Sequence, residues 1–132
     1  MILLIVGCGI DLVKIERIEQ IIKRWGDNFI SRIFTPLERE YCEIKKGNKF
    51  QSYAGKFAAK EAILKALGLG LREANWTEIE IKNDELGQPI IDISGKLKNI
   101  TSAKGVSKYF VSISHTKEYA IAQVIIENIL DK

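Results

Sequence analysis

Two carboxylates stand at positions where the surrounding sequence is apolar. Asp11 lies between Ile10 and Leu12 at the end of an apolar run, and Glu61 follows Phe57 by four residues on the apolar stripe of a predicted helix. A carboxylate that faces an apolar interior is expensive unless it is hydrogen-bonded or holds a cation. The two residues are therefore candidate ligands for a bound cation.

Each carboxylate also has a purely structural interpretation. Asp11 precedes a predicted helix and could cap it, because aspartate is a good N-cap residue. Spacing alone does not choose between this cap and a metal ligand. Glu61 could pair with Lys65, four residues later on the same helix, but such a pair is worth only ~0.2–0.5 kcal/mol. That is small against the cost of a charge facing the core, so the pair explains Glu61 poorly.

Other polar residues carry the same ambiguity. His115 is the single histidine and closes an apolar strand, a place where a structural histidine is more common than a catalytic one. A loose basic stretch is either a solvated face or a set of phosphate ligands. It comprises Lys45, Lys46, Lys49, Lys56 and Lys60.

Two glycines near the first carboxylate do not form a nucleotide-binding motif. Gly7-Cys8-Gly9 lacks the third glycine of a dinucleotide-binding fingerprint. We expect Gly7 and Gly9 to allow a close approach of the backbone beside Asp11.

Composition indicates one ordinary globular domain covering residues 1–132. The chain is 46% hydrophobic and 28% charged, and its net charge of +3 suits an anionic ligand but is too small to indicate nucleic acid. Cys8 and Cys42 have no CxxC partner, so we expect two reduced, buried thiols in a cytoplasmic protein. The apolar run at residues 1–6 is too short for a signal peptide or membrane span and indicates a buried strand.

Hydrophobic periodicity predicts the elements that must position these side chains. We expect helices over residues 15–25, 35–46, 51–67 and 94–105, the second of them opened by a capping box at Thr35 and Glu38. We expect strands over 2–12, 77–82, 89–93, 109–114 and 119–126, with the first strand central. The pattern predicts an α+β fold, with a mostly antiparallel sheet packed against helices on one side.

Four segments resemble, in order, the motifs of the holo-[acyl-carrier-protein] synthases, a group of 4′-phosphopantetheinyl transferases. They are GCGIDLV at 7–13, FTPLE at 34–38, KFAAKEAILKALG at 56–68 and VSISHTKEYA at 111–120. The third and fourth segments are the specific ones. The resemblance implies the 4′-phosphopantetheinyl transferase fold and transfer of the 4′-phosphopantetheine arm of coenzyme A to a serine of apo acyl carrier protein. It also implies magnesium dependence, release of adenosine 3′,5′-bisphosphate, a place in fatty acid biosynthesis, and a homotrimer with active sites at subunit interfaces.

The resemblance also assigns roles to residues. Asp11 and Glu61 match the family's metal ligands, while Lys65 and His115 match residues of the same catalytic site. The coenzyme A phosphates are expected to meet Lys56, Lys60, Lys65 and His115. At position 56 the family often has arginine, and lysine keeps the charge but loses the bidentate fork. A metal-activated water, Glu61 and His115 all remain candidates for the base that accepts the serine proton.

The partner protein is acidic by the same resemblance, and the first predicted helix offers a basic face for it. Arg17 matches a partner-binding residue of the family, and the face as a whole comprises Lys14, Arg17, Lys23 and Arg24. These residues could equally form the solvated side of an amphipathic helix.

Two other functions use the same residues. A magnesium-dependent phosphohydrolase or nuclease would share the metal site and the lysines. A binding module without catalytic activity would use Asp11 as a helix cap and Glu61 as the partner of Lys65.

Overall fold

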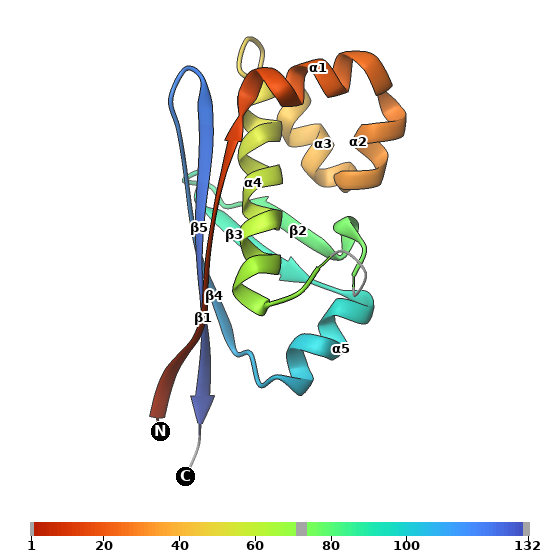
Figure 1. Cartoon of the computed structure of the whole chain (residues 1–132). Coiled ribbons are helices and arrows are strands. Elements are labelled where there is room, and N and C mark those ends of the chain that lie inside the picture. Colours follow the sequence, from red (N-terminus) through yellow and green to blue (C-terminus); the bar gives the residue numbers. More distant parts are fainter. Residues whose placement is uncertain (1, 71–73, 131–132) are drawn as a thin grey trace.

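The computed structural model describes residues 2–70 and 74–130. The strands are β1 (Ile2–Lys14), β2 (Ile79–Asn83), β3 (Pro89–Ile93), β4 (Lys108–His115) and β5 (Tyr119–Leu130). The helices are α1 (Ile15–Trp25), α2 (Asp27–Ile33), α3 (Pro36–Glu43), α4 (Lys49–Leu67) and α5 (Gly95–Ala103), with a short 3₁₀ helix η1 (Trp76–Glu78). The predicted α+β fold class is confirmed, because the paired strands are antiparallel and the helices lie on one side of the main sheet (Figure 1).

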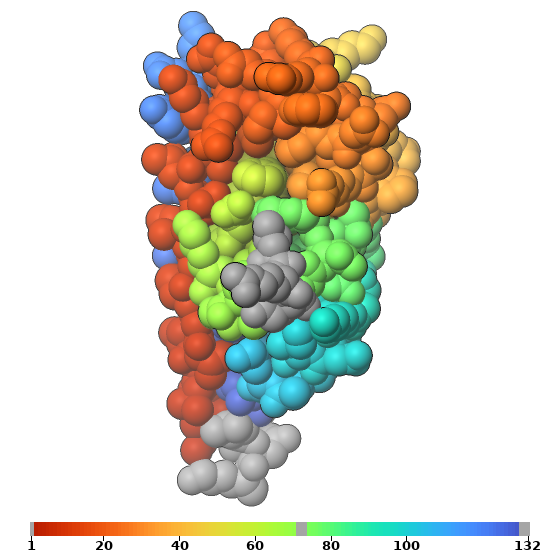
Figure 2. Space-filling view, turned by 45° about the vertical axis from the view of Figure 1, so that its right-hand side comes forward, coloured from red at the N-terminus to blue at the C-terminus, as the bar shows by residue number. Residues whose placement is uncertain are grey.

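The main sheet has the strand order β1-β5-β4, and β2 with β3 forms a separate hairpin. The prediction of a central first strand is wrong, because β1 is an edge strand that pairs with β5. Its register sets Asp11 opposite Ala122. Seen from another side, β1 runs along one margin of the molecule, and α1 continues from its upper end across the top (Figure 2).

Helix α4 is the centre of the fold. One side of it packs against β1 and β5, and the other sides contact α1, α3 and β2. Its buried positions include five alanines, whose small side chains let the neighbouring elements come close. They are Ala54, Ala58, Ala59, Ala62 and Ala66.

The glycines of β1 provide the matching surface on the strand. A Cβ atom at Gly9 would overlap the carbonyl oxygen of Ala62, and one at Gly7 would overlap that of Ala66. The expected close approach is therefore confirmed, with the α4 backbone as the neighbour. This contact brings the end of β1 that carries Asp11 against α4.

Local sequence signals explain most of the boundaries. The capping box of α3 forms as predicted, with Thr35 and Glu38 each accepting a backbone hydrogen bond, although α3 ends at Glu43 rather than near residue 46. Gly68 ends α4 in the left-handed conformation at φ 70°. Helix α2 and η1 were not predicted, because each is too short to display a helical period. In the part of the chain that is described, no helix is long and apolar enough to cross a membrane.

The side of the main sheet away from α4 is also apolar. The exposed fractions are 55% for Ile10, 60% for Leu12, 44% for Phe110 and 36% for Ile121. We call these four residues the outer face. The run at residues 1–6 was expected to form a buried strand, and in one chain this expectation is wrong, because residues 3–6 are 43–71% exposed. The expectation of burial was based on the apolar character of the strand, and both faces of the sheet are apolar.

The strand–helix contact can be tested at Gly9. We expect Gly9→Ala to lower the free energy of unfolding by about 1–3 kcal/mol or more, because the backbone of α4 has no space for the methyl group. Cys8→Ala is the matched control, since Cys8 is exposed on the same strand, although it was expected to be buried like Cys42. Urea unfolding followed by circular dichroism measures both variants. Equal stability of the two variants would show that β1 does not need this approach.

Candidate active site

Asp11 lies on the side of β1 that faces α4, with its side chain 13% exposed. Its Oδ1 accepts a hydrogen bond from the Lys65 ammonium at 3.0 Å, and the same ammonium donates to the carbonyl oxygen of Ile10 at 3.1 Å. The N-cap position of α1 is Lys14, with no side-chain cap. The helix-cap interpretation of Asp11 is therefore wrong.

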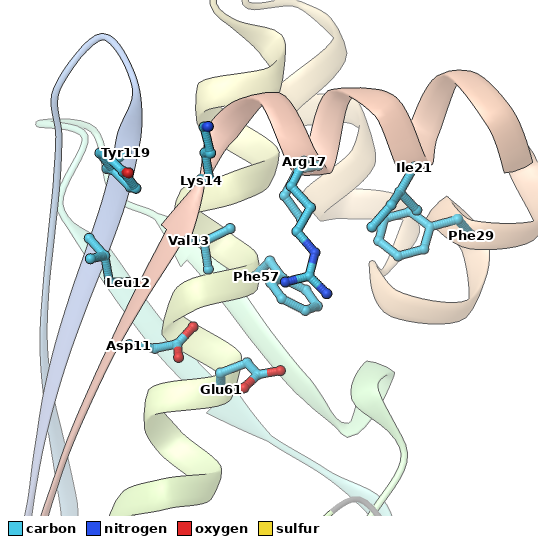
Figure 3. Close-up of a pocket in the computed structure, with 11 residues that line it drawn as sticks. Asp11, Leu12, Val13, Lys14, Arg17, Ile21, Phe29, Phe57, Glu61 and Tyr119 are labelled. Atoms are coloured by element: carbon cyan, nitrogen blue, oxygen red, sulfur yellow. The ribbon is translucent and has the colours of Figure 1, made fainter.

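Glu61 faces Asp11 from α4, and Figure 3 shows the two carboxylates side by side. Partial burial raises the pKa of Glu61, and the negative charge of Asp11 raises it further, while Lys65 and Arg17 lower it. The alternative that Lys65 serves as the partner of Glu61 does not hold, because its ammonium hydrogen-bonds Asp11. The fold thus brings two carboxylates together from segments far apart in the sequence.

The carboxylates lie in a pocket of about 390 Å³ between β1, α1, α2 and α4. We call it the carboxylate pocket. Its polar wall includes Lys14 and Arg17, and its apolar wall includes Phe29 and Phe57. The guanidinium group of Arg17 reaches down from α1 toward Glu61 (Figure 3). Basic side chains beside paired carboxylates suit a ligand that carries both an anionic group and a bound cation.

The residues present fit a hard divalent cation. The donors are carboxylate oxygens, and the Lys65 ammonium on Asp11 shows that this position already attracts positive charge. Among the described residues, no group of three or more histidine, cysteine or acidic side chains could hold a metal ion. A cation held by these two carboxylates would take water or phosphate oxygens as its other ligands, as is usual for magnesium and unusual for a structural zinc.

Lys56 and His115 lie in a second pocket, of about 170 Å³. Lys56 is buried and donates to the Ile81 carbonyl at 2.7 Å and to Asn83 Oδ1 at 2.6 Å, and burial lowers its pKa. His115 is exposed at the end of β4. Lys56 and Glu61 are five positions apart on α4 and so point roughly 140° apart around its axis. Within one chain, His115 and Asp11 therefore line different pockets, and their meeting at a subunit interface stays a prediction.

Lys60 does not fit its predicted role as a phosphate ligand. Its side chain is 0% exposed, and its ammonium lies 2.7 Å from Glu38 Oε1. It also donates to the carbonyl oxygens of Ile33 at 2.8 Å and Trp76 at 3.1 Å. Burial lowers its pKa, while the charge of Glu38 opposes that shift. Lys60 instead joins α4 to the ends of α2, α3 and η1.

The partner of Lys60 is the residue that sequence reasoning missed. Glu38 was recognised as half of a capping box, and it does accept from the Thr35 amide at 2.8 Å. Its other oxygen accepts from the Ile81 amide at 2.7 Å. The only signal in the sequence was a lysine at a helical position that is otherwise apolar, directly before Glu61.

The basic residues of α1 divide into two groups. Lys14 and Arg17 line the carboxylate pocket. Lys23 forms an ion pair with Glu19 at 2.7 Å, and the Arg24 guanidinium lies over the Trp25 ring. Of the predicted partner-binding set, the first two therefore border the site, and the last two extend along the helix away from it.

The buried ion pair between Lys60 and Glu38 leads to a testable prediction about stability. We expect Lys60→Met to cost about 3–5 kcal/mol of unfolding free energy, because it leaves Glu38 buried without its counter-ion. Lys60→Met combined with Glu38→Gln should cost less than the sum of the two single changes, as double-mutant cycles in urea would measure. Lys23→Met, which breaks an exposed pair, is the control and should cost under about 1 kcal/mol. A Lys60→Met cost as small as that of the control would remove Lys60 from this structural role.

Comparison with known proteins matches this geometry to one family. Residues 7–124 match the model of the 4′-phosphopantetheinyl transferase superfamily. The chain is 40% identical over 119 residues to the holo-[acyl-carrier-protein] synthase of Halothermothrix orenii, covering 90% of this chain and 94% of that protein.

Solved structures with the same fold have related sequences. A holo-ACP-synthase from Plasmodium yoelii is 34% identical with a TM-score of 0.85, covering 98% of this chain and 100% of that one. A holo-(acyl-carrier-protein) synthase from Bacillus anthracis, solved in complex with CoA (3′,5′-ADP), is 39% identical with a TM-score of 0.79, covering 95% and 98%. The likeness therefore extends over nearly the whole chain in both sequence and fold.

Proposed function

The chain belongs to the 4′-phosphopantetheinyl transferase superfamily, and on that premise we propose that it is a holo-[acyl-carrier-protein] synthase. It transfers the 4′-phosphopantetheine group of coenzyme A to a serine of apo acyl carrier protein and releases adenosine 3′,5′-bisphosphate. The main structural support for this proposal is that Asp11 and Glu61 line the same pocket, which Arg17 also borders. On the same premise, the reaction belongs to fatty acid biosynthesis in the cytoplasm.

The reaction depends more on stabilisation of the negative charge on the phosphates than on covalent catalysis by the protein. The serine oxygen forms a bond to a phosphorus of the coenzyme A pyrophosphate, the bond from that phosphorus to the bridging oxygen breaks, and the serine proton passes to a base. Asp11 and Glu61 would hold Mg²⁺, which when bound neutralises charge on the phosphates. Lys65, one turn beyond Glu61 and half exposed, can add positive charge on the leaving-group side. The base remains one of the three candidates above.

Acyl carrier protein would dock beside α1. Lys14 and Arg17 border the carboxylate pocket, and Lys23 and Arg24 continue the basic face along the helix. A row of positive charge that leads to the pocket would steer an acidic partner toward it.

The carboxylate residues give the decisive test. Incubation of the protein with coenzyme A, Mg²⁺ and an apo carrier protein should add one phosphopantetheine to the carrier, as intact-protein mass spectrometry measures. Asp11→Ala and Glu61→Gln should each lower the rate roughly a hundredfold or more, since the loss of several kcal/mol of charge stabilisation has that effect. Asp92→Asn on β3 removes an exposed carboxylate outside the pocket and away from α1, and it should leave the rate unchanged.

The same assay separates the rival activities. Cleavage of coenzyme A without a carrier protein would favour a phosphohydrolase. Wild-type rates in Asp11→Ala and Glu61→Gln, with circular dichroism showing intact folds, would exclude these carboxylates from the reaction. A carrier that gains no mass, under conditions where a known transferase modifies it, would contradict the proposed function.

We also propose a homotrimer in which neighbouring copies complete each active site. Two observations support this assembly. The outer face is apolar although one chain leaves it in water, as is typical of a surface that another chain covers. Lys56 and His115 lie in a different pocket from Asp11 within one chain, so a shared site needs these residues from a neighbour.

The outer face makes the assembly testable. Ile121→Asp places a charge on this face and should shift the protein from trimer to monomer in sedimentation velocity runs, with loss of transfer activity. Leu86→Asp changes a side chain that is 87% exposed on the β2–β3 turn and should leave the trimer intact.

Mixing variants tests the shared site itself. Asp11→Ala and His115→Ala subunits, each inactive alone, should regain part of the activity when they are unfolded together and refolded as mixed trimers. Mixed trimers without any recovery would show that each chain carries a complete site of its own.

A further inference from the structure

Lys65 binds the position on Asp11 that a metal ion would need. Its ammonium donates to Asp11 Oδ1 at 3.0 Å and to the carbonyl oxygen of Ile10 at 3.1 Å. The Asp11 side chain is 13% exposed, whereas that of Lys65 is 54% exposed. The carboxylate is thus enclosed, while the lysine reaches it from the solvent side.

The carboxylate pair explains why a cation is needed there. Asp11 and Glu61 lie side by side in a partly buried pocket (Figure 3), where like charges repel strongly. Lys65 supplies one positive charge to this pair, because its ammonium is hydrogen-bonded to Asp11. A lysine suits this task because its ammonium is a compact charge on a flexible stem.

A metal ion bound through Asp11 Oδ1 would compete with Lys65 for that oxygen. Magnesium binds carboxylate oxygens at about 2.0–2.1 Å. An ammonium hydrogen-bonded to the same oxygen would then lie close to a doubly charged ion and be repelled by it. The Lys65 side chain is about half exposed, so it is free to swing away from Asp11.

We propose that Lys65 is a built-in counter-ion of the carboxylate pocket, which a divalent cation displaces and which then becomes available to a phosphate group. The inference rests on the proposed function for the identity of the metal and the phosphate. The inference adds that metal binding and phosphate binding favour each other through Lys65. The metal displaces the Lys65 ammonium from Asp11, and the displaced ammonium can then bind a phosphate. By reciprocity, phosphate that draws Lys65 away must increase the affinity for the metal.

Metal affinity without any substrate tests this competition. We expect Lys65→Met to bind Mn²⁺ about three- to tenfold more tightly than the wild-type protein, since a partly exposed, hydrogen-bonded ion pair no longer has to be broken. Mn²⁺ titrations followed by electron paramagnetic resonance measure the free ion directly. The Lys65 side chain is largely in solvent, so we expect the variant to fold, and circular dichroism checks this.

Lys14→Met is the matched control. Lys14 borders the same pocket, and its side chain is also about half exposed, but it lies near Glu16 at 4.0 Å rather than on Asp11. Its removal reports the effect of one fewer positive charge near the metal, which should be smaller than the effect of removing Lys65. Adding Asp11→Asn to Lys65→Met should abolish the gain in affinity.

The outcomes separate this inference from the proposed function. Mn²⁺ affinity in Lys65→Met that equals or falls below that of the wild-type protein would overturn the counter-ion role, as would an equal gain in Lys14→Met. The absence of Mn²⁺ binding in every variant would overturn it too. In each of these cases, transfer of phosphopantetheine by the wild-type protein in the mass assay would still support the transferase.

Discussion

The close contact between β1 and α4 is the constraint on which the site depends. Gly7 and Gly9 leave no side chain between the strand and the helix backbone, so the strand lies directly on Ala62 and Ala66. Two residues after Gly9, the same strand delivers Asp11 to the pocket that α4 lines with Glu61. A fold that held these elements at the usual distance of packed side chains would separate the carboxylates. Backbone packing therefore determines where the charged groups meet.

Much of the fold could be predicted from the sequence because its signals are local. The period of apolar residues identified α1 and α4, and Thr35 with Glu38 marked the start of α3. Asp11 and Glu61 could be singled out because charge in an apolar pattern needs compensation. Their meeting was expected only through the family resemblance, since no local rule relates a strand end to a helix so far along the chain.

What could not be predicted depends on contacts between distant segments. Lys60 and Lys65 occupy the same helix and carry the same charge, yet one is enclosed by Glu38 while the other reaches Asp11 from solvent. Sequence spacing does not reveal which partner lies beside each lysine. The pocket of His115 could not be predicted for a related reason, because β5 lies between β4 and β1 and separates His115 from Val13 in the same row of the sheet.

The apolar outer face has a consequence for how this protein persists in the cell. A sheet with water on such a surface carries a free-energy penalty that folding of a lone chain does not remove. Under the proposed assembly, neighbours remove that penalty, so resistance to unfolding rises with the amount of protein present. Newly made chains at low abundance would then be the vulnerable population, open to proteolysis and non-specific association until they encounter copies of themselves.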